Sequence, residues 1–322
     1  MINPPPRRTP EEEAVRLGLI CGVAAYAMWG LFPIYLKSLD GASAFEILAH
    51  RIIWSAPFGA IILFMRRQWL EVFSALRSPR VLLMLALSSI AIAANWGIYV
   101  WAVVSDKILQ ASLGYYITPL TYVAAGVFIL GEKLRPAQVA AVVLAAIGVS
   151  VLTLGAGQFP WAAIALAILF TAYGYIRKTT PVGAMPGLFI ETAILSPAAL
   201  IYLVWLVSAG TAAFTTQGLG MDALLVFAGP VTVIPLVFFA LAARRLRLST
   251  IGFLQYIGPT GQFALGLYYG EAFTLAHAFC FAFIWAALIL FSWDAANASR
   301  AERLAQSAPP ITPTASASPK SS

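Results

Sequence analysis

The chain of 322 residues is 61% hydrophobic and only 10% charged, with a formal net charge of +7 at pH 7. Soluble domains carry about 25% charged residues, so this composition excludes an ordinary water-soluble fold. Apolar runs of about 20 residues, the length of a membrane-crossing helix, recur along the sequence, whereas the strands of a membrane barrel alternate over short distances. The basic residues form short clusters between these runs, which is typical of membrane topology and argues against a nucleic-acid partner.

The chain opens with a polar segment over residues 1–16, which we expect to be a cytosolic tail without a cleavable signal peptide. From residue 294 to residue 322 the sequence is rich in Ser, Pro and Ala, which predicts a disordered cytosolic tail. Between the tails, apolar runs predict an all-α integral membrane protein with ten transmembrane helices. These helices are expected over residues 17–36, 45–65, 81–103, 109–130, 136–154, 160–176, 187–207, 223–243, 250–270 and 274–293.

The distribution of basic residues tests this count. With the N-terminus in the cytoplasm, seventeen basic residues fall in inside segments, and only Lys37 and Lys107 fall in outside loops. This asymmetry agrees with the positive-inside rule. It predicts that both termini are cytoplasmic and that the chain lies in a bacterial cytoplasmic (inner) membrane. The remaining basic residue, Arg51, falls inside the second predicted helix.

A weak internal repeat relates the two halves of the chain. Residues 99–115 can be aligned with residues 237–253, and a Gly-Glu pair ends the helix that follows each segment. The repeat unit holds five predicted helices, so the second copy must enter the membrane from the opposite side. This predicts two inverted repeats, over residues 17–154 and 160–293, with a binding site near the membrane midplane between them.

Several stretches of the sequence resemble a known family, the RarD family of EamA-type permeases within the drug/metabolite transporter superfamily. The resemblance covers about residues 17–293 and implies ten helices in two EamA repeats and a role as an exporter or permease, without implying a substrate. The stretches that carry it are AYAMWGLFPIYLKSL (25–39), AHRIIWS (49–55), NWGIYVWAV (95–103), ASLGYYITPL (111–120) and GEKL (131–134).

Arg51 is the sharpest candidate for transport, because a charge at the bilayer centre costs about 2.5–3.5 kcal/mol on insertion scales. In one interpretation its planar donors anchor a carboxylate or phosphate of the solute. In the other, Arg51 lies close enough to the outer end of its helix for the head group to extend to the interface. The sequence leaves both interpretations open.

Glu46 and His50 lie on one face of the same predicted helix, four residues apart. An imidazole titrates near neutral pH, so the pair can couple transport to protons. The alternative is a hydrogen bond between the two side chains that only fixes the outer end of the helix.

Polar and aromatic stripes on several predicted helices indicate either a wet cavity or close helix packing. We assign their small residues to packing, and their aromatic and amide residues to a cavity suited to a small amphipathic or cationic solute. The candidate substrate-binding residues are therefore Trp29, Arg51, Asn95, Tyr99, Tyr115, Tyr173, Gln255, Tyr256 and Gln262.

Prolines inside the predicted helices, such as Pro33, Pro119 and Pro259, predict kinks that act either as hinges or as fixed bends. Glu132 and Glu271 recur at the same repeat position but on opposite faces of the membrane, so we interpret them as structural end-groups.

These features predict a secondary transporter that moves a small metabolite or drug-like solute by alternating access between two inverted halves. A flippase or carrier of a lipid-linked or amphiphilic substrate is the alternative. The sequence has no nucleotide-binding motif, metal-ligand cluster or catalytic motif, and no filter loop, so we expect no cofactor and neither an enzyme nor a channel. The expected partners are the solute and membrane lipids; the sequence leaves open a monomer or a homodimer.

Overall fold

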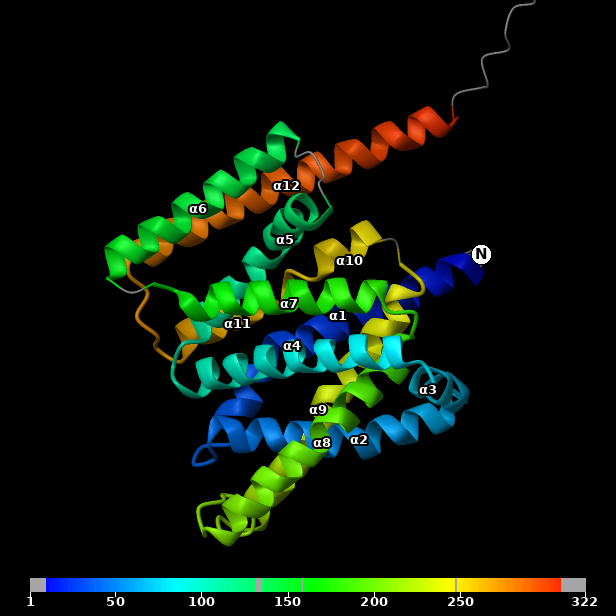
Figure 1. The fold of residues 1–322 in the computed structure, drawn as a ribbon. Coiled ribbons are helices and arrows are strands. Elements are labelled where there is room, and N and C mark those ends of the chain that lie inside the picture. Colours follow the sequence, from blue (N-terminus) through cyan, green and yellow to red (C-terminus); the bar gives the residue numbers. More distant parts are fainter. Residues whose placement is uncertain (1–9, 131–134, 158, 247, 308–322) are drawn as a thin grey trace, which may run out of the picture.

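The computed structural model describes residues 10–130, 135–157, 159–246 and 248–307, and within them it contains helices and no strand (Figure 1). The helices follow the apolar runs of the sequence. In chain order they are α1 (Pro10–Lys37), α2 (Ala44–Met65), α3 (Trp69–Leu76), α4 (Pro79–Val104), α5 (Ile108–Leu130), α6 (Pro136–Ala156), α7 (Trp161–Thr179), α8 (Ala184–Ser208), α9 (Leu219–Ala243), α10 (Leu248–Leu254), α11 (Ile257–Tyr268) and α12 (Leu275–Ser307).

Seven of the described helices are long and apolar enough to cross a membrane, namely α1, α2, α4, α6, α8, α9 and α12. Large apolar side chains are exposed along the bundle, for example Phe64, Ile90, Leu154 and Ile201. Monomeric soluble proteins rarely leave so much apolar surface uncovered. The fold is therefore that of a helical membrane protein whose outer surface faces lipid.

One predicted helix is broken in the structure. We expected a single helix over residues 250–270, but α10 ends at Leu254 and α11 begins at Ile257. Pro259 explains the break, because proline has no N–H and its ring crowds the carbonyl four residues earlier, that of Gln255. Interrupted helices of this kind line binding sites in several transporter folds.

Three other differences concern residues outside the predicted spans. The helix α3 lies in a segment that we predicted to be only a connection, and it packs on α4 and α8, where Val72 and Ala75 are buried. The first helix begins at Pro10, because proline suits the first helical position. The last helix continues to Ser307 through residues with high helix propensity, beyond the predicted start of the tail.

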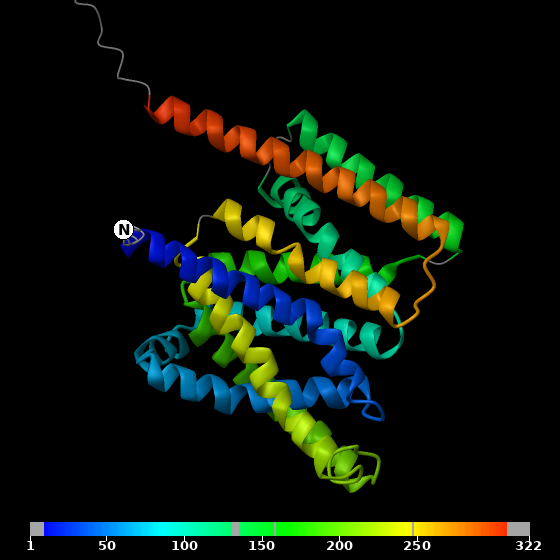
Figure 2. The ribbon, with the colours of Figure 1, turned by 180° about the vertical axis from the view of Figure 1, so that it is seen from behind.

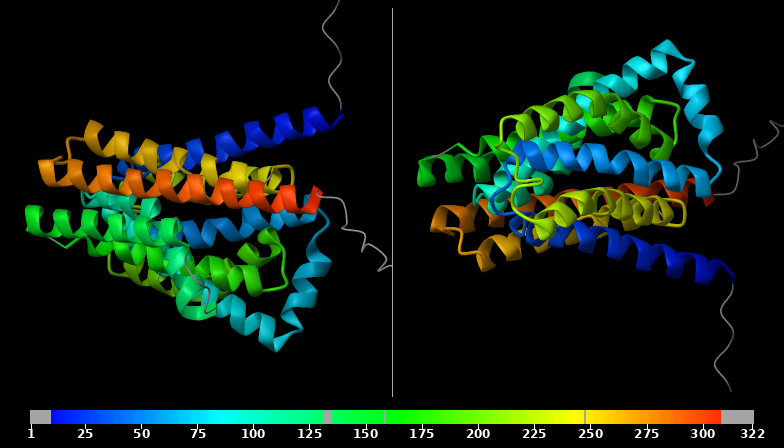
Figure 3. Two further views of the ribbon diagram at one scale, coloured as in Figure 1. Left: turned by 90° about the horizontal axis from the view of Figure 1, so that it is seen from above. Right: turned by 90° about the horizontal axis from the view of Figure 1, so that it is seen from below.

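The helices run broadly along one direction, and their connections alternate between the two ends of the bundle (Figures 1 and 3). The start of α1 and the end of α12 lie at the same end. The pair α6 and α12 packs side by side along one edge, while α2, α8 and α9 form the opposite edge, as the view from behind confirms (Figure 2). The remaining long helices lie between these two edges.

Most of the packing joins helices from different halves of the sequence. Helix α1 packs on α9 and α11, α2 packs on α8 and α9, and α4 and α5 both pack on α7. Contacts between helices of the same half are fewer, so the two halves interlock.

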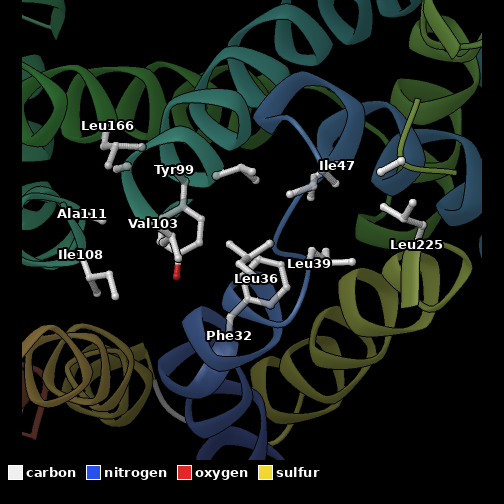
Figure 4. Close-up of a cluster of buried hydrophobic side chains, with 14 residues drawn as sticks. Phe32, Leu36, Leu39, Ile47, Tyr99, Val103, Ile108, Ala111, Leu166 and Leu225 are labelled. Atoms are coloured by element: carbon white, nitrogen blue, oxygen red, sulfur yellow. The ribbon is translucent and has the colours of Figure 1, made fainter. Parts of the chain in front are cut away.

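An apolar cluster fills the space between the halves at one end of the bundle (Figure 4). It includes Leu39 and Ala42 from the turn after α1 and Ile108 at the start of α5, which places it at the end where these connections lie. Phe32 and Leu225 extend it toward the middle. The bundle is therefore closed at this end.

Helices α2 and α9 approach each other closely at Gly229. A Cβ atom on Gly229 would lie 2.4 Å from the carbonyl oxygen of Trp54 and 2.9 Å from the ring of Phe58. The first of these contacts is with backbone, which cannot move aside as a flexible side chain can. Only glycine fits at this crossing, as is common where membrane helices pack closely.

We expect Gly229→Ala to destabilise the fold by about 1–3 kcal/mol, because the added methyl group must push α9 away from α2. The measurement is thermal unfolding of the purified protein in detergent. Gly220→Ala, in the same helix with nothing within 4 Å of the added Cβ, is the matched control and should leave the transition unchanged or slightly raised. Equal effects of the two substitutions would contradict this account of the crossing.

Candidate functional site

Arg51 lies buried between four helices of the bundle. Its side chain starts from α2, and only 5% of the residue is exposed. The guanidinium Nε donates to Thr232 Oγ1 on α9 at 3.2 Å. The guanidinium carbon lies 4.8 Å from the ring centroid of Phe32 on α1 and 4.7 Å from that of Trp96 on α4. Two aromatic faces thus enclose the charge, an arrangement that stabilises a cation in a site with little water.

A row of aromatic rings continues from this point across the bundle. Phe32 stacks on Tyr99 with ring centroids 5.8 Å apart, and Figure 4 shows these two side chains facing each other from α1 and α4. Tyr99 then contacts Tyr115 at 5.8 Å, and Tyr115 contacts Phe170 edge-on at 5.9 Å. The row therefore links α1 and α4 to α5 and α7.

Amide and hydroxyl groups fix part of this row. Asn95 donates to the carbonyl oxygen of Leu166 at 3.0 Å and accepts a bond of 3.3 Å from the hydroxyl of Tyr115. The hydroxyl of Tyr99, by contrast, is buried without a hydrogen-bond partner among the described residues. Four of the predicted binding residues, Arg51, Asn95, Tyr99 and Tyr115, thus form one connected cluster.

Two further candidates meet at the crossing of α1 and α11. Gln262 is buried, and its side-chain amide donates to the carbonyl oxygen of Trp29 at 3.2 Å. The Trp29 ring contacts Tyr26 and Phe239. The helices can approach here because Gly30 faces Gly261 at this crossing.

Of the other three candidates, Gln255 and Tyr256 have no recorded contact with the cluster around Arg51, whereas Tyr173 is joined to it through Phe170. Tyr256, in the link between α10 and α11, stacks on Tyr116 with centroids 6.3 Å apart. Gln255 lies in the same link. Tyr173 on α7 continues the aromatic row beyond Phe170 and donates from its hydroxyl to Glu191 at 3.4 Å.

Glu46 and His50, the predicted proton-coupling residues, are both buried but bind different partners. Glu46 accepts the backbone N–H of Phe214 at 3.0 Å, in the connection between α8 and α9. His50 Nδ1 accepts a bond of 3.1 Å from the indole N–H of Trp54, and its Nε2 is buried without a partner among the described residues. No direct bond between the two side chains is recorded in that part of the chain.

A second buried charged cluster joins α4, α7 and α8. Glu191 is fully buried and accepts from Ser88 Oγ at 2.5 Å, while Arg177 Nε lies 3.5 Å from its carboxylate. Arg177 also donates to the carbonyl oxygen of Gly183 at 2.9 Å. The sequence marks each of these residues as polar within or beside an apolar run, but it gives no signal that they meet.

At the closed end, Glu271 binds the start of α5. Its carboxylate accepts the backbone N–H groups of Ile108 and, at 2.8 Å, of Leu109. A carboxylate at a helix N-terminus satisfies unpaired donors and the helix dipole. Burial raises the pKa of Glu271, and the two N–H groups oppose that shift. This geometry agrees with the interpretation of Glu271 as a structural end-group; Glu132 lies outside the described residues.

The three candidate hinge prolines differ in their local effect. Helices α1 and α5 continue through Pro33 and Pro119, whereas the chain is interrupted just before Pro259. Of the three, only Pro259 therefore lies at a visible break.

The sequence analysis missed three of the residues around Arg51. Phe32 and Trp96 lie in ordinary apolar runs, where an aromatic side chain carries no signal of its own. Thr232 lies between apolar neighbours in α9 and is the single polar side chain that binds Arg51 among the described residues. The described residues also contain no group of three or more His, Cys, Asp or Glu side chains arranged to hold a metal ion.

Comparison with known proteins shows where the chain belongs. Residues 16–154 match the model of the EamA-like transporter family. An uncharacterized transporter of Vibrio cholerae is 45% identical over 92% of this chain and 99% of its own length. The protein RarD of Escherichia coli is 41% identical over 90% of this chain and 98% of its own length. This chain belongs to the RarD family of EamA-like transporters.

Membership of the RarD family indicates a membrane permease of the drug/metabolite transporter type. The bacterial relatives and the seven apolar helices fit a multi-pass protein of the inner membrane. A more distant family relative, in Pseudomonas aeruginosa, is named a chloramphenicol-sensitive protein and is 30% identical over 88% of this chain and 96% of its own length. The crystal structure of another protein shares the fold, with a TM-score of 0.54, 23% identity, and coverage of 85% of this chain and 96% of that chain.

We predict that Glu191→Ala destabilises this RarD-family protein by about 3–5 kcal/mol, because it leaves Arg177 buried without its counter-charge. The double variant Arg177→Met with Glu191→Leu removes both charges and should be markedly more stable than Glu191→Ala alone. Thermal unfolding in detergent measures both. A double variant that is no more stable than Glu191→Ala would contradict the view that the two side chains act as a pair.

Proposed function

We propose that this chain is a secondary transporter that carries a small metabolite or drug-like solute across the bacterial inner membrane. The observation that carries the proposal is the cluster around Arg51. Arg51 is a costly intramembrane charge that is held between helices from both halves of the sequence. The chain that carries it belongs to a transporter family. Charged residues within the membrane are retained where they serve substrate or ion pathways.

The transporter would cross the membrane ten times. Seven crossings correspond to the long apolar helices, and we assign the others to α5, α7 and the broken pair α10 and α11. The alternation of connections between the two ends of the bundle supports this assignment (Figure 1). The short helix α3 would lie at the cytoplasmic end, beside the basic residues Arg66, Arg67 and Arg77.

The two repeats, residues 17–154 and 160–293, would be related by a two-fold axis in the membrane plane. Exchanging each helix of the first repeat with its counterpart in the second turns the contact of α1 with α11 into the contact of α7 with α5. The same exchange turns the contact of α1 with α9 into that of α7 with α4, and both members of each pair are present. This pairing supports an inverted repeat.

Alternating access requires the two ends of the bundle to open in turn. The apolar cluster around Leu39 and Ile108 closes one end, and Lys37 forms an ion pair with Asp106 there. We assign this end to the periplasm, because the basic clusters of the chain lie in the opposite connections. Opening would part α1 from α4 and α5, with the break before Pro259 and the prolines Pro33 and Pro119 as candidate hinges.

The proposed orientation predicts which introduced cysteines a membrane-impermeant maleimide reaches. In intact cells, Asp40→Cys, in the turn after α1, should be labelled, whereas Ser318→Cys should be labelled only after the membrane is opened. The native Cys21 and Cys280 are buried and provide the background. Labelling of Ser318→Cys in intact cells would overturn the cytoplasmic position of the C-terminus.

Transport itself is tested in liposomes that contain the purified protein. We expect saturable uptake of at least one member of a solute library of mixed charge, and acceleration of that uptake by the same solute inside the vesicles. An imposed pH gradient tests the proton coupling proposed for Glu46 and His50, with His50→Gln as the variant expected to lose the response. Failure to exchange any solute would refute the transporter; exchange that ignores the gradient would refute only the coupling.

A further inference from the structure

We infer that the solute is an organic monoanion, a carboxylate joined to a flat apolar body, and that its carboxylate supplies the counter-charge of Arg51. This inference rests on the proposed function, because it names the class of solute for the same site. Three observations carry it: the missing counter-charge, the free edge of the guanidinium, and the chemistry of the surrounding side chains.

Arg51 has no anionic partner among the described residues. The two fully buried glutamates are occupied elsewhere, since Glu46 binds the backbone of Phe214 and Glu191 binds Arg177. The ion pairs of the described chain are Lys37 with Asp106, Arg135 with Asp294, and Arg177 with Glu191. Aromatic faces stabilise a cation but do not cancel its charge, so a buried guanidinium in this state favours binding of an anion.

The terminal end of the guanidinium has donor capacity left for that anion. Phe32 and Trp96 lie against the guanidinium, and Thr232 occupies Nε. The terminal nitrogen Nη1 is buried and has no hydrogen-bond partner among the described residues. Buried donors are nearly always satisfied, so an unpaired one needs an explanation such as a ligand. An acceptor that pairs with Arg51 would bind Nη1 at the edge of the guanidinium, and a carboxylate is the acceptor whose geometry best matches a guanidinium.

The neighbouring side chains define the rest of the solute. Arg51 is the one basic side chain recorded in this cluster of described residues, so the cluster balances a single negative charge better than the two charges of a phosphate. Tyr99 offers a second unpaired polar atom, its buried hydroxyl, on the ring that stacks against Phe32. The aromatic row offers flat apolar surfaces. The sequence alone favours an amphipathic or cationic solute. In the structure, the positive charge of Arg51 lies among these rings and would repel a cationic solute.

The first experiment measures the thermal unfolding of the full-length protein in detergent with matched probes. Benzoate, benzamide and benzylamine share one ring and differ in charge; hexanoate, hexanamide and hexylamine form the flexible alkyl series, and phenyl phosphate supplies a dianion. Benzoate should raise the unfolding temperature by several degrees in a concentration-dependent manner, because a ligand that binds only the folded state stabilises it. The amides, the amines and sodium chloride at equal ionic strength should leave it unchanged, and hexanoate and phenyl phosphate should act more weakly than benzoate.

The second experiment assigns this stabilisation to Arg51. Arg51→Gln should abolish the shift by benzoate, and Thr232→Val, which frees Nε, should weaken benzoate binding several-fold. Arg51→Lys keeps the charge and should retain a reduced shift. If Arg51→Gln does not fold, Arg51→Lys still tests whether the charge at this position binds benzoate. Lys178→Gln removes an exposed charge at the end of α7 and is the control that should bind benzoate normally.

Four results would overturn the inference: equal stabilisation by neutral or cationic probes, an equal effect of chloride alone, no stabilisation by any carboxylate, or benzoate binding that survives in folded Arg51→Gln. The liposome assay separates this failure from failure of the transporter. If only neutral or cationic solutes are exchanged, the proposed transport function stands and the inferred carboxylate solute is wrong. If carboxylates bind through Arg51 but no solute is exchanged, the inferred carboxylate site stands and the proposed transport function is wrong.

Discussion

Lipid cannot form hydrogen bonds with a buried polar side chain, so each such group in this bundle must find its partner within the protein. Glu191 satisfies this requirement with Ser88, Tyr173 and Arg177, and Glu46 satisfies it with a backbone N–H. Arg51 satisfies it only in part, through one hydroxyl and two aromatic faces. Arg51 also differs from Arg177 in its charge balance, because Arg177 is paired with Glu191 and Arg51 has no counter-charge among the described residues.

Much of the fold follows from the sequence, because the length of an apolar run directly reflects the thickness of the membrane. The break before Pro259 does not follow, since Pro33 and Pro119 lie in helices that continue through them. Whether a proline interrupts a helix depends on how neighbouring groups satisfy the freed carbonyl, which is a tertiary property. The short helix α3 was missed for a related reason: its burial depends on apolar side chains of α4 and α8.

The candidate site was predictable to the extent that polarity stands out in an apolar run. Arg51, Asn95 and Tyr99 are conspicuous for this reason, and the structure brings them into one cluster. The partners that give the cluster its character are not conspicuous. Phe32 and Trp96 differ from ordinary lipid-facing aromatics only in their position against a guanidinium, and position becomes visible only when the helices are packed.

The interlocking of the two halves limits which parts of the bundle can move as rigid bodies. Helix α2 from the first half is in backbone contact with α9 from the second at Gly229, and α4 and α5 lie against α7. A rigid body that moves during transport must therefore contain helices from both halves, because neither half can rotate without breaking its packing against the other. Neither half would then be expected to fold alone, and the two would have to be synthesised together before either could bury its apolar faces.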